Sequence, residues 1–255
     1  MRQGFVIPVY NHGDTLGAVV SELEKYNLPI IVVDDGNDAQ NKALIDGVAR
    51  ANKNVTVITN KRNRGKGSSV CRAVSFAKQM GITHLFQIDA DGQHDTQATC
   101  RDFLEESKAN PDALICGCPE LDDTIPPARL KAKKISNGYT QFVSLCKEKI
   151  PDSMCGYRIY PVEPFYKIMR RAWIDSHMGF DSEILVRMIW AGVPVVYKQV
   201  RVTYPVGGKS NFRTVRDNLH ISFMFTRLTI EMCLRFPWLK ARQMKRQKKL
   251  REDKR

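Results

Sequence analysis

The sequence predicts an α/β domain in which helices cover both faces of a mostly parallel sheet. Short apolar segments of strand type recur through the first half of the chain, and their starts lie 25 to 30 residues apart. Segments with helical patterning separate them, and this alternation is typical of βαβα chains. The strand segments are continuous apolar runs, as expected of parallel strands that are covered on both faces.

The elements of the first half follow in chain order. The expected strands are Phe5–Val9, Ile30–Val33, Val55–Ile58, His84–Ile88 and Leu114–Cys116. The expected helices between them cover approximately residues 14–26, 38–51, 67–80 and 96–108. Ligands of such sheets gather at the carboxyl ends of the strands, so the loops that follow these runs are the first place to look for a site.

The second half is less regular. Helical patterns cover residues 129–147, 162–171 and 180–191, and the next strand-like run is Val193–Val202. We find no internal repeat and no low-complexity linker in the sequence. We therefore expect one domain over residues 1–211, followed by an extension over residues 212–255.

Residues 212–238 have the pattern of an amphipathic helix. Most of the polar side chains are separated by three, four or seven residues, which places them in one stripe. They are Arg213, Arg216, Asp217, His220, Arg227, Glu231 and Arg235. Two interpretations fit this pattern. The helix packs on the domain, or its apolar face enters a bilayer while the basic tail meets anionic headgroups.

The chain is basic, with 40 Lys or Arg against 27 Asp or Glu and a formal net charge of +13 over 255 residues. Nine basic and two acidic residues lie in residues 240–255, so about half of the excess belongs to this tail. Such a charge favours a polyanionic partner: nucleic acid, an anionic membrane or a phosphorylated substrate. Because the sequence has no RNP motif, zinc finger or base-reading basic helix, we expect no nucleic-acid partner.

Composition also bears on the compartment. No stretch approaches 18 uncharged apolar residues, so we expect no transmembrane helix, and the first residues lack the pattern of a signal peptide. The seven cysteines are scattered, without a CxxC pair. We therefore expect the reduced thiols of a cytosolic protein and no zinc site.

The strongest chemical motif follows the strand-like run His84–Ile88. Asp89 and Asp91 stand two residues apart on a turn that contains glycine, so they can converge on one hard cation such as Mg²⁺ or Mn²⁺. Such a cation shares its ligand shell with substrate phosphates and stabilises charge on a diphosphate leaving group. The structural alternative is a turn that caps the next helix, a role that suits Asp95.

Three further segments also follow strands or open a helix. Asp35, at the end of the second strand, can accept hydrogen bonds from a base or a ribose hydroxyl. After the first strand, Pro8 stiffens the loop and Tyr10 offers a ring and a hydroxyl to a nucleotide. Lys66 lies in a glycine-flanked loop at a helix start, which favours anions. The spacing matches neither a Walker A loop nor a dinucleotide fingerprint.

The order and spacing of these segments resemble glycosyltransferase family 2, which has the GT-A fold, and in particular its branch of dolichyl- or polyprenyl-phosphate sugar synthases. The matching segments are IPVYN at 7–11, VVDDGN at 32–37, NRGKGSS at 63–69, IDADGQHD at 88–95, DSMCGYR at 152–158, MGFDSEIL at 178–185 and GGKSN at 207–211. The resemblance extends over residues 4 to about 212, which is most of the chain.

The resemblance implies a nucleoside site and a metal site. Pro8, Tyr10 and Asp35 would hold the nucleoside. Asp89 and Asp91 would form the DxD pair that binds Mg²⁺ or Mn²⁺, with Asp91 as the principal ligand.

The resemblance also implies roles around the phosphates and the acceptor. Gln93 would support the metal, and Asp181 would be a catalytic or acceptor-orienting carboxylate. Lys66, Arg158 and Lys209 are the basic residues that would meet donor or acceptor phosphates.

Two positions depart from the branch that the chain resembles. The branch has a phosphate-binding Arg after its fifth strand, where this chain reads Gly117-Cys118-Pro119. His12 stands where the branch commonly has Glu. A lipid phosphate, a lipid hydroxyl and a glycan hydroxyl therefore all stay open as acceptors. A hydroxyl would need a general base, for which Asp181 is the candidate.

The function that the resemblance implies is metal-dependent, inverting transfer of a sugar from a UDP- or GDP-type nucleotide-diphosphate sugar to a lipid-linked or glycan acceptor of the cell envelope. With the basic tail, we expect a cytoplasmic enzyme that is peripheral on the inner face of the cytoplasmic membrane. Two alternatives are kept: a sugar nucleotidyltransferase on a similar sheet, although the loop at 8–12 lacks the glycines expected of one, and a non-catalytic polyanion-binding protein.

Overall fold

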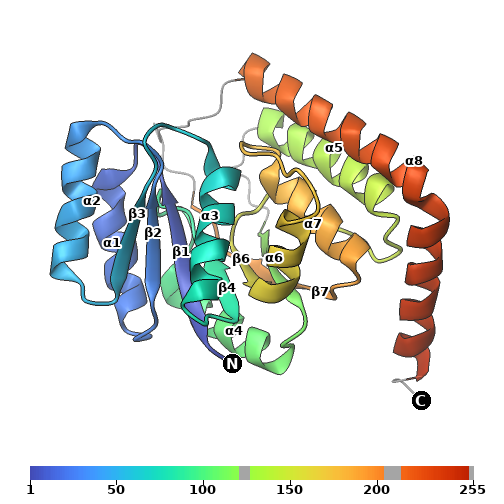
Figure 1. Cartoon of the computed structure of the whole chain (residues 1–255), viewed down its shortest axis with the longest axis horizontal. Coiled ribbons are helices and arrows are strands. Elements are labelled where there is room, and N and C mark those ends of the chain that lie inside the picture. Colours follow the sequence, from blue (N-terminus) through green and yellow to red (C-terminus); the bar gives the residue numbers. More distant parts are fainter. Residues whose placement is uncertain (121–126, 204–213, 253–255) are drawn as a thin grey trace.

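A computed structural model describes residues 1–120, 127–203 and 214–252. It contains a seven-stranded sheet in the order β3-β2-β1-β4-β6-β5-β7 (Figure 1). The strands are β1 (Gln3–Val9), β2 (Ile30–Asp34), β3 (Val55–Thr59), β4 (His84–Gln87), β5 (Leu114–Pro119), β6 (Arg158–Pro161) and β7 (Val195–Val200). The helices are α1 (Gly13–Glu24), α2 (Ala39–Ala51), α3 (Lys66–Gln79), α4 (Thr96–Ala109), α5 (Pro127–Ser144), α6 (Val162–Met169), α7 (Phe180–Ala191) and α8 (Thr214–Glu252).

The predicted α/β fold is confirmed, with one strand that the sequence pattern did not reveal. The first four strands and the β5–β7 pair are parallel, as expected. The short strand β6 lies between β4 and β5 and runs antiparallel to both. Four residues that begin with an arginine do not form a recognisable apolar run, so this strand depends on its two neighbours for pairing.

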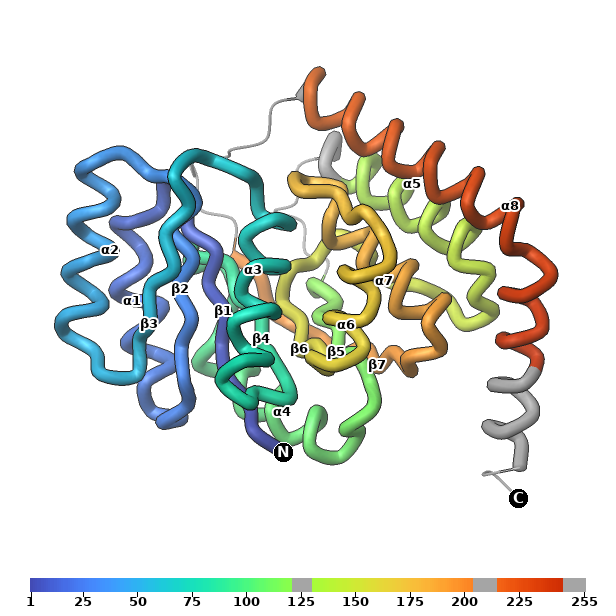
Figure 2. The backbone as a smooth tube through the Cα atoms, in the orientation of Figure 1, coloured from blue at the N-terminus to red at the C-terminus, as the bar shows by residue number. Residues whose placement is uncertain are grey.

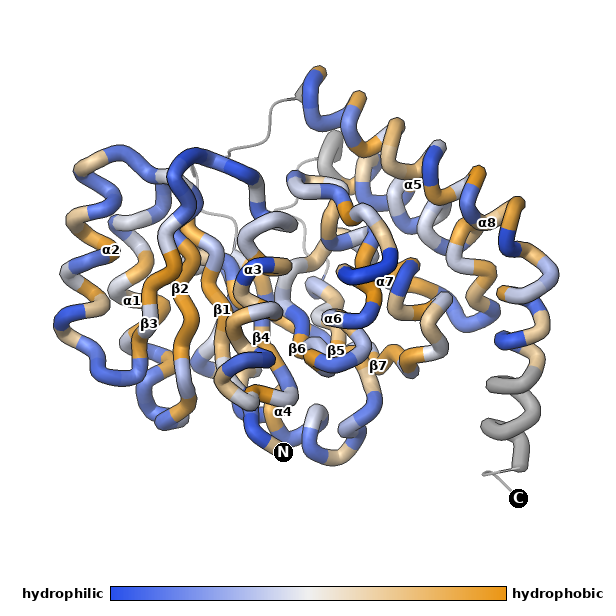
Figure 3. Tube along the Cα trace, viewed as in Figure 1, coloured by the Kyte–Doolittle hydropathy of each residue, from blue (hydrophilic) through white to orange (hydrophobic). Residues whose placement is uncertain are grey.

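Helices cover both faces of the sheet, as Figure 2 shows. One apolar core joins α1, α2 and α4 to the sheet, and the second joins α3, α6 and α7 to the opposite face. Successive strand side chains alternate between these cores: Val6 and Ile31 belong to one, whereas Ile7 and Ile30 belong to the other. Figure 3 accordingly shows hydrophobic residues concentrated in β1, β2 and β4 at the centre of the molecule.

The helix α8 packs outside this sandwich, against α5 and α7 (Figure 1). The side chains that join the three helices are apolar and buried: Val143, Val186, Trp190, Met224, Phe225, Leu228, Met232 and Leu239. One face of α8 therefore packs on the domain, as the first of the two interpretations expected.

The same helix is longer than its sequence pattern indicated. It passes through Pro237 and ends at Glu252, although a proline normally breaks a helix because it lacks the N–H donor. Tertiary contacts hold the turns beyond the proline. Leu239 is buried, and Arg242 donates to the carbonyl of Trp190 at 2.8 Å.

Ion pairs to two buried side chains of α7, Glu183 and Arg187, also attach α8 to the first turns of that helix. The carboxylate of Glu183 accepts from Arg187 Nε and from an Arg227 guanidinium N–H, each at 2.6 Å. Glu231 of α8 in turn accepts from Arg187 at 3.0 Å. We call Glu183, Arg187, Arg227 and Glu231 the anchor cluster. Part of the polar stripe of α8 thus faces the domain, because it pairs with charges on α7.

Candidate active site

The loops after β1, β2 and β4 meet the start of α3 at the carboxyl edge of the sheet. Asp35 follows β2, and its buried carboxylate accepts from the main-chain N–H groups of Arg64 (3.0 Å) and Gly65 (2.8 Å). It also accepts from the side chain of Asn60 at 2.8 Å. Asp35 therefore fixes the loop that precedes Lys66. Its predicted contact with a nucleoside stays a prediction.

Asn37, in the loop after β2, joins the ends of β1 and β2. Its side chain donates to the carbonyl of Val9 at 2.9 Å and to Asp34 at 2.7 Å, and it accepts from the main chain of Asn11 at 2.7 Å. The turn also needs a glycine at position 36, where φ is +72° and a Cβ would collide with the backbone of Arg62. These bonds hold the ends of two neighbouring strands together.

Lys66 connects the ends of two distant chain segments. Its ammonium lies 2.8 Å from Oδ1 of Asp89 and 3.0 Å from Oδ2 of the same carboxylate. It also lies 3.0 Å from Oδ2 of Asp181, at the start of α7. We call Lys66, Asp89, Asp91 and Asp181 the site cluster. The structure thus brings together predicted residues that are more than 90 positions apart in the sequence.

The charges in this cluster reinforce one another. Burial by itself would lower the pKa of Lys66, but the negative charges of Asp181 and Asp89 outweigh it and raise that pKa above its ordinary value. Burial opposes ionisation of Asp89, yet Lys66 and His94 lower its pKa below the ordinary value. Lys66 is therefore an ammonium and Asp89 a carboxylate at neutral pH.

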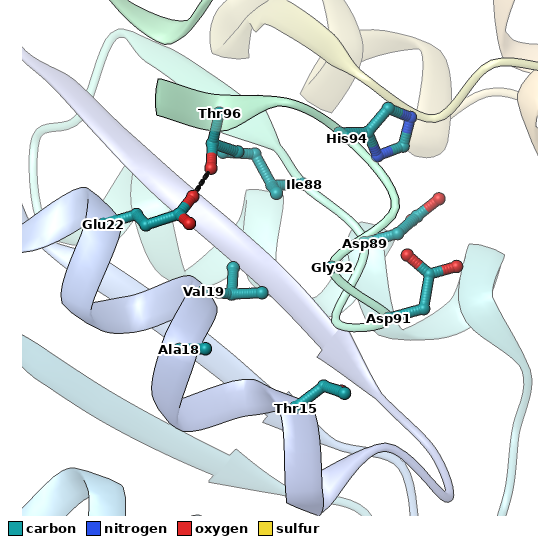
Figure 4. A pocket seen from close by; sticks show the side chains of 10 residues that line it. All are labelled: Thr15, Ala18, Val19, Glu22, Ile88, Asp89, Asp91, Gly92, His94 and Thr96. Atoms are coloured by element: carbon teal, nitrogen blue, oxygen red, sulfur yellow. Dashed lines mark hydrogen bonds between the residues drawn. The ribbon is translucent and has the colours of Figure 1, made fainter. Parts of the chain in front are cut away.

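Asp91 lies beside a pocket between α1 and the loop after β4. Figure 4 shows Asp89, Asp91 and His94 on the same side of this loop. The pocket encloses about 240 Å³, and Thr15, Val19 and Glu22 of α1 form its other wall. One oxygen of Asp91 accepts from the main-chain N–H of Gln93 at 3.0 Å, which orders the turn. Asp95 caps α4 by accepting from Ala98, as the structural alternative predicted for that residue.

The donor set suits a hard divalent cation that is shared with a substrate. Asp89 and Asp91 offer carboxylate oxygens, which Mg²⁺ and Mn²⁺ prefer. Among the residues that the structure describes, no three His, Cys, Asp or Glu side chains form a metal cage. Mg²⁺ in proteins is often held by one or two carboxylates together with substrate phosphates, and Asp89 and Asp91 could provide these carboxylates.

Arg158 differs from its prediction as a phosphate ligand. Its side chain is 0% exposed, and it donates to the main-chain carbonyls of Asp181 (2.5 Å) and Ser153 (2.8 Å). The physical reason is the position of β6 in the middle of the sheet, which places this arginine under the start of α7. Arg158 therefore positions Asp181 through its backbone and presents no surface to a phosphate.

Two neighbours of the cluster were missed in the sequence. The buried side chain of Gln87 donates to Asp181 Oδ1 at 3.3 Å and accepts from Tyr160 at 3.1 Å. At Gly156, an added Cβ would collide with the Lys66 ammonium and stand 2.9 Å from Asp89 Oδ2. The sequence offered a signal for Gln87, because a polar glutamine ends an otherwise apolar strand. It offered none for Gly156, whose importance depends on tertiary contact.

The other predicted residues are only partly placed. Pro8 lies within β1 and not in the loop that was expected to contain it, because it pairs in register with Val33 of β2. Tyr10 follows the strand, and both residues are half-buried near the edge of the sheet that carries Asp35. Lys209 lies outside the described residues, so its predicted phosphate contact stays a prediction. The support expected of the Gln93 side chain for a metal likewise stays a prediction.

Comparison with known proteins identifies the family of the chain. Residues 5–177 match the family described as glycosyl transferase family 2. The chain is 24% identical over 244 residues to a dolichyl-phosphate beta-glucosyltransferase of Dictyostelium discoideum, a match that covers 86% of this chain and 73% of the other. It is 29% identical over 205 residues to a polyprenol monophosphomannose synthase of Mycolicibacterium smegmatis, with 78% and 76% covered. Both relatives fit the predicted branch.

Solved structures show the same fold. A mannosyl-3-phosphoglycerate synthase from Rubrobacter xylanophilus has a TM-score of 0.62 at 18% identity, covering 93% of this chain and 75% of the other. A mannosyltransferase from Pyrobaculum calidifontis, in complex with GDP-Man and Mn²⁺, has a TM-score of 0.53 at 13% identity, covering 80% and 57%. The family match, which spans most of the chain, replaces both the nucleotidyltransferase and the polyanion-binding alternatives. This protein is a glycosyltransferase and belongs to glycosyltransferase family 2.

Proposed function

We propose that this glycosyltransferase moves a sugar, with inversion, from a UDP- or GDP-type sugar to the phosphate of a polyprenyl or dolichyl lipid. The observation that carries the choice of acceptor is the ion pair between Lys66 and Asp181, 3.0 Å long. Both oxygens of Asp181 are already engaged, one by this ammonium and the other by the side chain of Gln87 at 3.3 Å. A hydroxyl acceptor would need a base with an available oxygen, whereas a phosphate acceptor is already ionised and needs no base. The relatives whose names include dolichyl phosphate or polyprenol support the same choice.

The donor would bind across the carboxyl edge of the sheet. Pro8 at the end of β1, Tyr10 after it and Asp35 after β2 would face the nucleoside. The diphosphate would then extend toward the site cluster. Parallel α/β sheets bind their ligands at this edge, because strand ends and helix starts converge there.

Mg²⁺ or Mn²⁺ would be held by Asp91 and Asp89, with support from Gln93. When bound, the cation supplies charge neutralisation of the donor diphosphate. The structural relative in complex with Mn²⁺ supports the use of a divalent metal in this fold.

The transfer is a single displacement. A phosphate oxygen of the acceptor attacks the anomeric carbon from the face opposite the diphosphate. The new carbon–oxygen bond forms as the bond to the donor phosphate breaks, and the nucleoside diphosphate leaves with the electron pair. Asp181 and Arg158 act as positioning groups in this scheme, because the arginine holds the backbone at the start of α7.

The test compares a polyprenyl phosphate with the corresponding polyprenol as acceptors, using labelled UDP- and GDP-sugars with Mn²⁺. We expect transfer to the phosphate alone and a product whose anomeric configuration, measured by NMR, is inverted. Asp181→Asn should retain its rate within about tenfold, because no proton has to be removed. Transfer to the alcohol with a loss of several orders of magnitude in Asp181→Asn would instead identify a hydroxyl acceptor and a general base.

The proposal places the enzyme on the inner face of the cytoplasmic membrane. Within the described part of the chain, no helix is long and apolar enough to span a bilayer. The outer face of α8 nevertheless exposes large apolar side chains: Val215, Leu219, Phe223, Ile230 and Leu234. The neighbouring helix α5 exposes Ile135, Tyr139 and Phe142. Exposed apolar groups on a helix whose sequence continues into a polybasic tail are typical of an interfacial membrane helix.

Cys233 offers a direct test of this orientation. It is exposed between Ile230 and Leu234 on the outer face of α8. An environment-sensitive fluorophore on Cys233 should shift to the blue with vesicles that contain anionic lipid and much less with neutral vesicles. An unchanged spectrum, together with no flotation on anionic vesicles, would remove the membrane from the proposal while leaving sugar transfer unaffected.

A further inference from the structure

Lys66 holds the position of a cation in the site cluster. Both oxygens of Asp89 lie within 3.0 Å of its ammonium, and an oxygen of Asp181 lies at the same distance. In the protein alone, this single ammonium is therefore the counter-charge of two carboxylates. One of those two is a proposed metal ligand.

A divalent ion and this ammonium compete for Asp89. Mg²⁺ takes carboxylate oxygens at about 2.0–2.1 Å, and both oxygens of Asp89 already face Lys66. Two cations on one carboxylate repel each other, and the repulsion is strong where solvent access is limited. Binding of a metal by Asp89 and Asp91 together therefore requires Lys66 to release Asp89.

The backbone of Lys66 is fixed, but its ammonium can change partners. Gly65 and Gly67 on either side lie so close to carbonyl oxygens of the loop before α7 that a Cβ would collide with them. The side chain itself is 20% exposed, and Asp181 stays within reach when Asp89 is released. When the ammonium leaves Asp89, the negative charge of an incoming diphosphate can replace that carboxylate as its partner.

We infer that Lys66 makes metal binding depend on the donor, because its ammonium holds Asp89 until a nucleoside diphosphate attracts it away. This inference rests on the proposed function and concerns the same site. Metal alone binds weakly, and metal and nucleotide bind together with positive coupling. Lys66 is thus a positioning residue whose charge is exchanged between Asp89 and the phosphates of the donor.

The experiment measures Mn²⁺ binding by electron paramagnetic resonance, with and without UDP or GDP. In the natural protein, one of the two nucleotides should raise Mn²⁺ affinity by about tenfold or more. Lys66→Gln should bind Mn²⁺ without nucleotide about tenfold more tightly than the natural protein. The factor by which nucleotide improves Mn²⁺ binding should shrink, and by linkage so should the factor by which Mn²⁺ improves nucleotide binding.

Matched variants separate the role of Lys66 from a general change of charge. Arg64→Gln removes the same charge from an exposed side chain two residues away and should leave Mn²⁺ affinity unchanged. Lys66→Met keeps the apolar stem and should behave as Lys66→Gln does. Lys66→Arg keeps the charge and should preserve the weak binding and the coupling. Thermal unfolding of each variant establishes that it is folded.

The outcomes distinguish two failures. If the natural protein binds no Mn²⁺ even with either nucleotide, both the metal-dependent function and this inference are wrong. If the natural protein shows the coupling and folded Lys66→Gln and Lys66→Met retain it in full, only the role assigned to Lys66 is wrong.

Discussion

Two ionic clusters begin on the same turn of α7, and they differ in how completely their charges are paired. Glu183 belongs to the anchor cluster, where its 0% exposed side chain meets two arginines and the main-chain N–H of Asp175. Asp181, two residues earlier, belongs to the site cluster. There one ammonium, that of Lys66, is shared between two carboxylates.

This difference separates a structural ion pair from a functional one. In the anchor cluster two carboxylates meet two guanidinium groups, and the side chains of Glu183 and Arg187 are 0% and 3% exposed, so a change of partner there leaves a buried charge without compensation. The site cluster has three carboxylates and one ammonium, so it can accept a further cation or exchange its own. Neighbouring carboxylates on one helix can therefore serve stability and chemistry separately.

The largest effect is expected from removing a charge of the site cluster. Asp91→Asn should reduce the rate of sugar transfer by about a thousandfold, because a neutral amide is a weaker ligand for the divalent cation. Initial rates at saturating nucleotide sugar and Mn²⁺ measure this. Asp95→Asn is the matched control, because asparagine also caps a helix, and it should change the rate by no more than a few-fold. An Asp91→Asn enzyme that keeps most of its rate would contradict the metal assignment.

Mutations in the anchor cluster should lower the free energy of unfolding. Glu183→Gln removes the buried carboxylate that Arg187 and Arg227 share, which should cost about 3 kcal/mol and lower Tm by roughly 6–12 °C. Asp181→Asn keeps an oxygen acceptor and leaves Lys66 paired with Asp89, so it should cost about 1 kcal/mol. Calorimetry of the two variants tests the comparison directly. Equal losses of stability would mean that the two clusters do not differ as described.

The outer face of α8 should govern membrane binding, because the anchor cluster holds the opposite face on the domain. Leu234 is 80% exposed, and Leu234→Ser should weaken binding to anionic vesicles by roughly tenfold through the loss of one buried apolar side chain. Vesicle sedimentation measures the partition. Leu44→Ser, an exposed leucine on α2, is the matched control and should leave binding unchanged. Equal binding by both variants would argue against α8 as the contact surface.

The smallest effect concerns a titrating group outside both clusters. Burial lowers the pKa of His84 below its ordinary 6.5, and the neutral ring donates to the carbonyl of Pro111 at 2.7 Å. The unfolded chain therefore binds a proton more readily, so this contribution to stability is complete above about pH 6.5 and declines as the pH falls below it. Urea unfolding at about pH 8 and about pH 5 measures how much free energy of unfolding is lost in acid. This loss should be smaller for His84→Gln than for the natural protein. An identical loss would exclude His84 as a source.

The positions of the site residues in the first half were predictable because they follow strong local patterns. Asp35 comes directly after β2 and Asp89 lies two residues after β4. Because parallel strands end at one edge of the sheet, the convergence of these residues follows from the alternation of strands and helices. The resemblance to the family then supplied the roles that spacing alone cannot. The described positions of the strands confirm this part of the prediction.

Other features were hidden because they depend on contacts between distant residues. The short strand β6 is held by its neighbours, and this burial turned Arg158 from an expected phosphate ligand into a support for Asp181. The sequence placed Lys66 in a basic loop, but its two carboxylate partners come from different parts of the chain. Local periodicity carries no information about such pairs.

For helix α8, one property follows from the sequence alone and another depends on the tertiary structure. The sequence by itself determined that residues after 214 form a helix with polar and apolar stripes, because helical spacing is a local property. Only the tertiary structure decided which stripe faces inward. The buried charges of α7 select Arg227 and Glu231 as partners, since an unpaired buried charge costs more than an exposed apolar side chain.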